Sequence, residues 1–235
     1  MAAGFGIRMG EYTKNIPKPL LLINNVPLIY YSLYNFYKWK IEKIYINVHY
    51  LGDMILEKLY GYPHAKLIFS KEKNILGTAG GIRTAIGNDL NQFLVLLNPD
   101  TILIPDGTDF QANNLFSENF HSMLYVSEKK ENTEETGFDF TSEKDPGVLS
   151  FSDSGRYYYI GFSIINGQIL KNIPPSTKSE LGEIWKNSNT NLRGRVFRGS
   201  YFDCGNASSY EILRDKKIYT EKDLDWEKFR KSCRI

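Results

Sequence analysis

The first twenty residues combine small residues and two cations in a spacing that suits a polyphosphate. Residues 1–10 read Met-Ala-Ala-Gly-Phe-Gly-Ile-Arg-Met-Gly, and Pro-Lys-Pro-Leu follows at 17–20. Glycines such as Gly4 and Gly6 let backbone N–H groups approach phosphate oxygens closely, and Arg8 and Lys18 can neutralise the charge of such a ligand. This loop therefore predicts an anion-binding site.

The spacing separates this loop from two common phosphate-binding loops. A P-loop needs Gly-x-x-x-x-Gly-Lys-Ser/Thr, which is absent, and a dinucleotide fingerprint needs a third small residue where Met9 stands. A Gly-x-Gly taken alone is typical of an ordinary tight turn, so the interpretation depends on the cations that accompany it.

Two aspartates that lie far apart in the sequence could hold a metal ion. Asp100 follows the apolar run 93–97, which places it at the carboxyl end of a strand, where open α/β sheets bind ligands. Asp203 lies in a Gly-Ser-Tyr-Phe-Asp-Cys-Gly stretch. Mg²⁺ normally engages one or two carboxylates together with phosphates, so the pair is chemically sufficient. Taken singly, Asp100 also fits a turn and Asp203 a helix cap or turn.

A second glycine-rich turn, Leu-Gly-Thr-Ala-Gly-Gly at 76–81, opens a predicted helix. Backbone groups exposed by Gly80 and Gly81 could read the edge of a base, because small residues let a flat ring pack against the chain. A plain helix N-terminus is the alternative.

The elements that must position these residues alternate between strands and helices in the first half of the chain. This pattern predicts an α/β fold with a doubly wound, mostly parallel sheet, followed by a smaller β-rich part. The predicted strands are 43–48, 66–69, 93–97, 122–127, 148–151 and 157–165, and the predicted helices are 27–39, 53–60 and 207–215. Residues 128–147 are expected to form a loop or hairpin.

Composition narrows the class of protein further. With 235 residues, 42% of them hydrophobic, the chain can bury one substantial core, and we expect a single domain over 1–235. A net charge of +2 gives no electrostatic case for a nucleic acid or an anionic membrane as partner. The absence of a long apolar run and of a signal segment predicts a cytoplasmic protein. No pattern indicates an oligomeric state.

Together these motifs resemble those of the sugar-1-phosphate nucleotidyltransferases, whose signature is Ala-Ala-Gly-x-Gly-x-Arg-Met followed by Pro-Lys-Pro-Leu. The resemblance runs from Ala2 to about Tyr210, with the motifs in the order of the family. It implies a Rossmann-like, GT-A-like fold that uses Mg²⁺. It also implies the reaction of a nucleoside triphosphate with a sugar 1-phosphate, which gives a nucleoside diphosphate sugar and pyrophosphate.

The resemblance also implies a role for each motif. Arg8 and Lys18 would be catalytic, Arg8 on the β- and γ-phosphates and Lys18 on the reacting phosphoryl groups. Asp100 and Asp203 would bind the metal, with Pro99 in place of the usual glycine. Nucleotide contacts would fall on Ala2, Ala3, Gly4, Gly6, Gly77, Thr78, Gly80 and Gly81, and sugar contacts on Asn98 and Gly161.

The identity of the nucleotide rests on shorter segments. Asn-Val-His-Tyr-Leu at 47–51 resembles a stretch of the N-acetylmuramic acid 1-phosphate uridylyltransferases and favours uridylyl transfer, although His49 alone is typical of a structural histidine. The turn at 76–78 fits guanylyltransferases for mannose or heptose 1-phosphate equally, and phosphocholine cytidylyltransferases share it. A non-catalytic sugar-nucleotide-binding homologue is the alternative from another class, and the retained cations and carboxylates oppose it.

In the family, a buried apolar strand precedes the first loop, whereas here only Met1 stands before Ala2. A parallel sheet that lacks a central strand would lose apolar burial and leave backbone groups unpaired. We therefore expect the native protein to begin further upstream and to include this strand.

Overall fold

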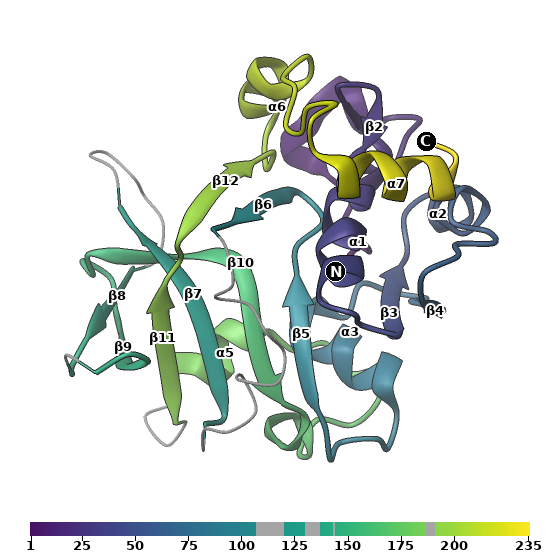
Figure 1. The fold of residues 1–235 in the computed structure, drawn as a ribbon. Helices are drawn as coiled ribbons and strands as arrows, with labels where there is room; N and C mark the ends of the chain where they lie inside the picture. Colours follow the sequence, from purple (N-terminus) through teal and green to yellow (C-terminus); the bar gives the residue numbers. More distant parts are fainter. Residues whose placement is uncertain (107–119, 130–136, 143, 187–190) are drawn as a thin grey trace. The chain divides into compact units, whose positions relative to one another are not determined.

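The structure, a computed structural model, describes residues 1–106, 120–129, 137–142, 144–186 and 191–235 (Figure 1). The chain forms two compact units. Unit 1 comprises Met1–Ile75, Pro99–Ile104 and Tyr201–Ile235, and unit 2 comprises Leu76–Asn98 and Pro105–Ser200. Each unit therefore draws on stretches that are distant in the sequence, and the single domain expected over 1–235 stays a prediction.

Unit 1 is built of short strands and of helices that surround an aromatic core. A parallel pair of strands, β3 (Lys43–Val48) and β4 (Lys66–Lys71), is joined through helix α2 (Gly52–Lys58). The strands β6 (Thr101–Pro105) and β12 (Gly199–Asp203), most of whose residues belong to this unit, pair with each other. Its other elements are η1 (Ile7–Thr13), η2 (Lys18–Leu20), β1 (Leu22–Ile23), β2 (Val26–Pro27), α1 (Leu28–Lys38), α6 (Ala207–Leu213) and α7 (Leu224–Cys233).

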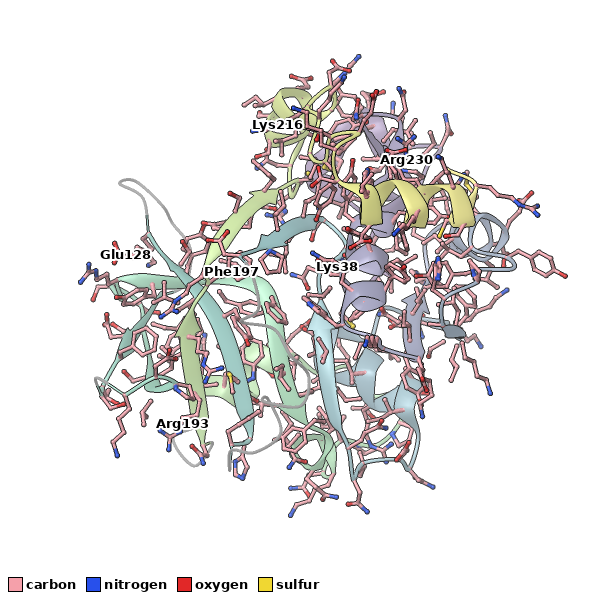
Figure 2. The ribbon with its side chains drawn as sticks, viewed as in Figure 1. Lys38, Glu128, Arg193, Phe197, Lys216 and Arg230 are labelled. Carbon is pink, nitrogen blue, oxygen red and sulfur yellow. The ribbon has the colours of Figure 1, made fainter. Side chains whose placement is uncertain are left out.

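Helix α1 is buried over most of its length because α7 packs against it (Figure 1). Trp226 on α7 stacks on Tyr31, with 5.3 Å between the ring centroids, and meets Tyr34 edge-on at 4.9 Å. Lys38, labelled in Figure 2 at the end of α1, places its ammonium 5.0 Å from the centroid of the Tyr34 ring. Large aromatic side chains contribute strongly to such a core, since each buries much apolar area.

The buried tyrosines of unit 1 should make the protein sensitive to alkali. Burial raises the pKa of Tyr30 and Tyr34 to about 12, from 10.0, and it raises the pKa of Tyr31 and Tyr219 as well. Because the folded state then holds protons that the unfolded chain has released, stability falls as pH rises from 10 towards 12. We expect the urea midpoint, followed by circular dichroism, to be constant up to about pH 9 and to decline above pH 10. A Tyr34→Phe variant should show a shallower decline, and an equal slope would contradict this account.

Unit 2 is organised around a six-stranded sheet whose strand order is β5-β10-β7-β11-β9-β8. Its strands are β5 (Phe93–Leu97), β7 (Ser122–Glu128), β8 (Gly137–Phe140), β9 (Gly147–Ser152), β10 (Tyr157–Asn166) and β11 (Leu192–Val196). Its helices are α3 (Gly77–Ile86), η3 (Gly167–Leu170) and α5 (Leu181–Lys186). The core of the sheet includes Phe162 on β10, which stacks on Tyr125 of β7 with 3.9 Å between the centroids.

The strands of this sheet run in both directions, which corrects the expectation of a mostly parallel sheet. Among the described strands of unit 2, β7 and β11 are parallel, whereas β10 is antiparallel to β5, β7 and β8. The reason lies in the connections: parallel neighbours need a crossover of a dozen or more residues, and only 141–146 and 153–156 separate β8, β9 and β10. The parallel expectation holds for β3 and β4, whose connection contains a helix.

The predicted elements otherwise correspond closely to those of the structure. The strands expected at 43–48 and 93–97 are β3 and β5 residue for residue, and the helix expected at 27–39 is α1 with slightly shorter bounds. The loop or hairpin expected at 128–147 contains β8, which forms a hairpin with β9, and residues 130–136 and 143 of it lie outside the described residues. Across the described part of the chain, the helices are too short or too polar to span a membrane.

Candidate active site

The glycine-rich loop of unit 1 is held in shape by hydrogen bonds from two side chains. Gly6 has a φ of +67°, and a Cβ there would lie 2.9 Å from Cγ2 of Thr13, so the position suits glycine alone. The Thr13 hydroxyl donates to the Gly6 carbonyl at 3.1 Å, and the Tyr50 hydroxyl donates to the Lys14 carbonyl at 2.7 Å. These contacts present Arg8 at the exposed surface of a fixed loop.

The start of the loop is anchored by a buried polar chain that begins at Ala2. The Ala2 N–H donates to Oδ1 of Asn47 at 2.8 Å, and Nδ2 of Asn47 donates to Oε1 of Glu72 at 2.7 Å. His49 belongs to the same arrangement, because its Nδ1 lies 2.8 Å from the Glu72 carbonyl, which can only accept. The structural interpretation of His49 is therefore supported. Glu72 was missed by sequence reasoning, because nothing local marks a buried acid as an anchor.

Lys18 and Asp100 form the centre of the candidate site. Lys18 lies in the short helix η2, between two prolines that restrict its backbone. Its Nζ donates to Oδ2 of Asp100 at 2.5 Å and to the Gly205 carbonyl at 3.1 Å. The two side chains are only 12% and 22% exposed, so the pair is largely shielded from water.

Asp203 reaches the same place from the end of β12. The Cys204 N–H donates to the Asp100 carbonyl at 2.8 Å, so the two aspartate segments are hydrogen-bonded to each other. The strand that follows Asp100 is held in turn by Asn35 on α1, whose Nδ2 donates to the Leu103 carbonyl at 3.0 Å. Asp203 does not cap helix α6, because Asn206 does so by accepting from the Ser209 N–H at 2.9 Å.

The electrostatics show that the four predicted charged residues act on one another. Burial and the negative charge of Asp100 raise the pKa of Asp203, whereas a hydrogen bond from the Gly205 backbone and the charges of Lys18 and Arg8 oppose that rise. Two carboxylates, Asp100 and Asp203, that lie close together and partly shielded from water attract cations. Arg8, Lys18, Asp100 and Asp203 therefore all lie in unit 1, where Lys18 contacts Asp100 and the charges of the other three act on Asp203, and their roles stay predictions.

The donor atoms of this site fit Mg²⁺, which prefers oxygen ligands. Asp100 and Asp203 offer carboxylate oxygens and Gly205 a carbonyl oxygen, and the Lys18 ammonium already lies where a cation is stabilised. Within the described residues, no three His, Cys, Asp or Glu side chains gather into a metal-binding group. Two carboxylates are what Mg²⁺ normally uses when phosphates complete its shell.

The second glycine-rich turn belongs to unit 2 and is covered by the segment 177–180. Oε2 of Glu180 accepts from the Thr78 N–H at 3.0 Å and from the Thr78 hydroxyl at 2.5 Å. The Gly80 N–H donates to the Ser179 carbonyl at 3.1 Å, and a Cβ on Gly80 would lie 2.1 Å from the Thr177 carbonyl oxygen. The close approach of the Thr177 carbonyl therefore explains why position 80 is a glycine, and this structural explanation was missed by sequence reasoning.

The two residues expected to contact the sugar lie next to each other in unit 2. The Asn98 N–H donates to the Gly161 carbonyl at 2.9 Å. Gly161 has a φ of +84° and lies where the register of β10 shifts between Tyr159 and Phe162. The expected nucleotide contacts divide between the units: Ala2, Ala3, Gly4 and Gly6 belong to unit 1, and Gly77, Thr78, Gly80 and Gly81 belong to unit 2. That both groups of residues contact one nucleotide stays a prediction.

Comparison with known proteins identifies the family to which this chain belongs. Residues 1–146 match the family described as the MobA-like NTP transferase domain. The chain therefore belongs to the MobA-like NTP transferase domain family. The fold agrees with that of a UDP-glucose pyrophosphorylase from Acinetobacter baumannii, with a TM-score of 0.74, 16% identity, and coverage of 90% of this chain and 89% of that one.

Two curated relatives show which members of the class are similar in sequence. The chain is 29% identical over 108 residues to D-glycero-alpha-D-manno-heptose 1-phosphate guanylyltransferase of Aneurinibacillus thermoaerophilus, covering 45% of this chain and 46% of that protein. It is 27% identical over 219 residues to N-acetylmuramate alpha-1-phosphate uridylyltransferase of Neisseria meningitidis serogroup B, covering 87% of this chain and 91% of that one. The match thus spans less than half of the heptose enzyme and most of the muramate enzyme.

Proposed function

We propose that the protein transfers a nucleotidyl group from a nucleoside triphosphate to a sugar 1-phosphate, with Mg²⁺ as cofactor. The observation that carries this proposal is the contact of the Lys18 ammonium with Asp100, beside Asp203 and within electrostatic reach of Arg8. The names of the two curated relatives support the same reaction class. A non-catalytic homologue would have no evident need for cations and carboxylates assembled in one place.

In the proposed reaction, an oxygen of the sugar phosphate attacks the α-phosphorus of the triphosphate in line. A bond from that oxygen to the α-phosphorus forms, the bond from the α-phosphorus to the bridging oxygen breaks, and pyrophosphate leaves with the electron pair. The attacking oxygen is already anionic, so no side chain needs to remove a proton. Catalysis then consists mainly of positioning and charge neutralisation.

Each charged residue of unit 1 has a place in this scheme. Lys18 would neutralise the reacting phosphoryl group, and Arg8 the departing β- and γ-phosphates. Asp100 and Asp203 would hold Mg²⁺, which supplies positive charge to the phosphoryl oxygens when bound. Because Lys18 contacts Asp100 directly, we expect its ammonium to be close to both the metal and the phosphate.

Uridylyl transfer is the form of the reaction that we propose first. The Neisseria relative matches over most of both chains, and residues 47–51 of this chain resemble the corresponding stretch of such enzymes. Guanylyl transfer to mannose or heptose 1-phosphate is the second candidate, because the heptose guanylyltransferase is similar over 108 residues. Cytidylyl transfer to phosphocholine is the third.

A substrate panel tests the proposal. We expect pyrophosphate release when the protein is mixed with Mg²⁺, UTP and N-acetylmuramic acid 1-phosphate, and no release when either substrate is left out or EDTA is added. GTP with mannose or heptose 1-phosphate, and CTP with phosphocholine, test the other candidates in a coupled pyrophosphatase assay. Nucleotide binding without pyrophosphate release from any pair would favour the non-catalytic homologue.

A further inference from the structure

Glu180 places a carboxylate directly on the second glycine-rich turn of unit 2. Its Oε2 accepts both the backbone N–H and the hydroxyl of Thr78. Its Oε1 lies against Gly77, where a Cβ would approach within 2.4 Å, and in the described part of the chain this oxygen accepts no hydrogen bond. The residue as a whole is exposed, so its carboxylate can be reached from the solvent.

The carboxylate is held in one orientation by its surroundings. Two charge-assisted hydrogen bonds to Oε2 hold the carboxylate against Thr78. The backbone beside it is fixed as well, because the Ser179 N–H donates to the Leu76 carbonyl at 2.9 Å and its carbonyl accepts from Gly80. An acceptor held beside the partly exposed Gly77, which has no side chain, suits a flat ring that approaches edge-on.

We infer that Glu180 selects the base of the nucleotide, an inference that rests on the proposed function. An ionised carboxylate can only accept hydrogen bonds. Uracil offers N3–H on its Watson–Crick edge, and guanine offers N1–H and the N2 amino group. Cytosine and adenine instead present the acceptors N3 and N1 at the ring-nitrogen position, and their amino donors lie to one side of it. We expect Oε1 of Glu180 to face the ring nitrogen, where it would favour UTP and GTP over CTP and ATP.

The substitution Glu180→Gln replaces the hydrogen-bond acceptor on which this selection depends with a donor. The amide oxygen can keep both hydrogen bonds from Thr78, and the amide NH₂ then takes the place of Oε1, so that a donor replaces the acceptor. A mismatched polar contact costs about 1–3 kcal/mol, which is about a 5- to 150-fold effect on affinity. We expect the affinity for UTP relative to CTP to fall by about tenfold in this variant, measured by titration calorimetry with Mg²⁺ and without sugar phosphate.

Two further variants distinguish selection from a merely structural role. Glu183→Gln changes an exposed glutamate on α5 and should leave the UTP to CTP ratio unchanged. Glu180→Ala should weaken UTP and GTP without strengthening CTP. An unchanged ratio in Glu180→Gln, or an equal loss for UTP, GTP, CTP and ATP, would overturn the inference. Wild-type protein that binds none of the four would contradict the proposed function as well, whereas equal wild-type affinities would contradict this inference alone.

Discussion

Lys18→Ala should reduce pyrophosphate release by about 10²- to 10³-fold, the loss typical of removing one group that stabilises transition-state charge. Within the described residues, Lys18 is the side chain that donates to both Asp100 and the Gly205 carbonyl, so its loss removes the cation in direct contact with Asp100. Steady-state kinetics with saturating substrates measure the loss as a change in kcat. Asp100→Asn, which weakens the same contact from the other side, should show a loss of the same kind.

The control for this prediction is Lys14→Ala. The Lys14 side chain is 63% exposed and pairs with Glu11 three residues earlier, so it shares the loop region without sharing the site. We expect its kcat to stay close to that of the wild type. Because turnover should fall far more than stability, the melting temperature of each variant is measured alongside. Near-normal pyrophosphate release by a folded Lys18→Ala protein would refute the assignment.

Gly80→Ala should destabilise the protein by about 1–3 kcal/mol, the usual cost of inserting a methyl group where there is no room. The added Cβ would lie 2.1 Å from the Thr177 carbonyl oxygen, and a backbone atom cannot rotate away as a side chain can. In most helices the same change stabilises by about 0.5–1 kcal/mol, because alanine has less conformational freedom to lose. The clash should therefore reverse the usual sign.

Gly182→Ala is the matched control, because a Cβ at this position of α5 would meet no atom within 4 Å. We expect it to leave stability unchanged or to raise it by about 0.5–1 kcal/mol. Urea denaturation followed by circular dichroism compares both variants with the wild type. Equal stability of the two variants would show that the segment 177–180 does not press against Gly80.

The sequence predicts best those elements whose pattern is local. The strands β3 and β5 are short apolar runs bounded by polar residues, and α1 repeats its apolar residues with a helical period, so each can be recognised within a few neighbours. The strands β6 and β12 are not predicted by this reasoning. Thr-Ile-Leu-Ile-Pro is a short, mostly buried apolar run that ends in a proline, and Gly-Ser-Tyr-Phe-Asp is largely exposed, so neither has the full length and alternation that mark a strand in the sequence.

The residues of the candidate site likewise divide into those marked by a local sequence motif and those defined only by contacts distant in the sequence. Arg8, Lys18, Asp100 and Asp203 could be found because each lies in a short motif with recognisable chemistry. Glu180 could not be found, since it contacts Thr78 across 102 positions of the sequence and lies in a stretch without such a motif. The mixed direction of the unit 2 sheet was missed for a related reason: strand order follows from the tertiary fold rather than from any one strand.

Unit 1 is assembled from three separate stretches of the chain, and this affects how it can fold during synthesis on the ribosome. Lys18 and Asp100 emerge early, whereas Asp203 and the α7 residues Trp226 and Phe229 belong to the last of the three stretches that form the unit. Until residues 201–235 have left the exit tunnel, the tyrosines of α1 lack their covering helix and Asp100 lacks its acidic neighbour. A nascent chain can therefore finish much of unit 2 while unit 1 is still open, and its exposed aromatic face is where we expect a chaperone to act.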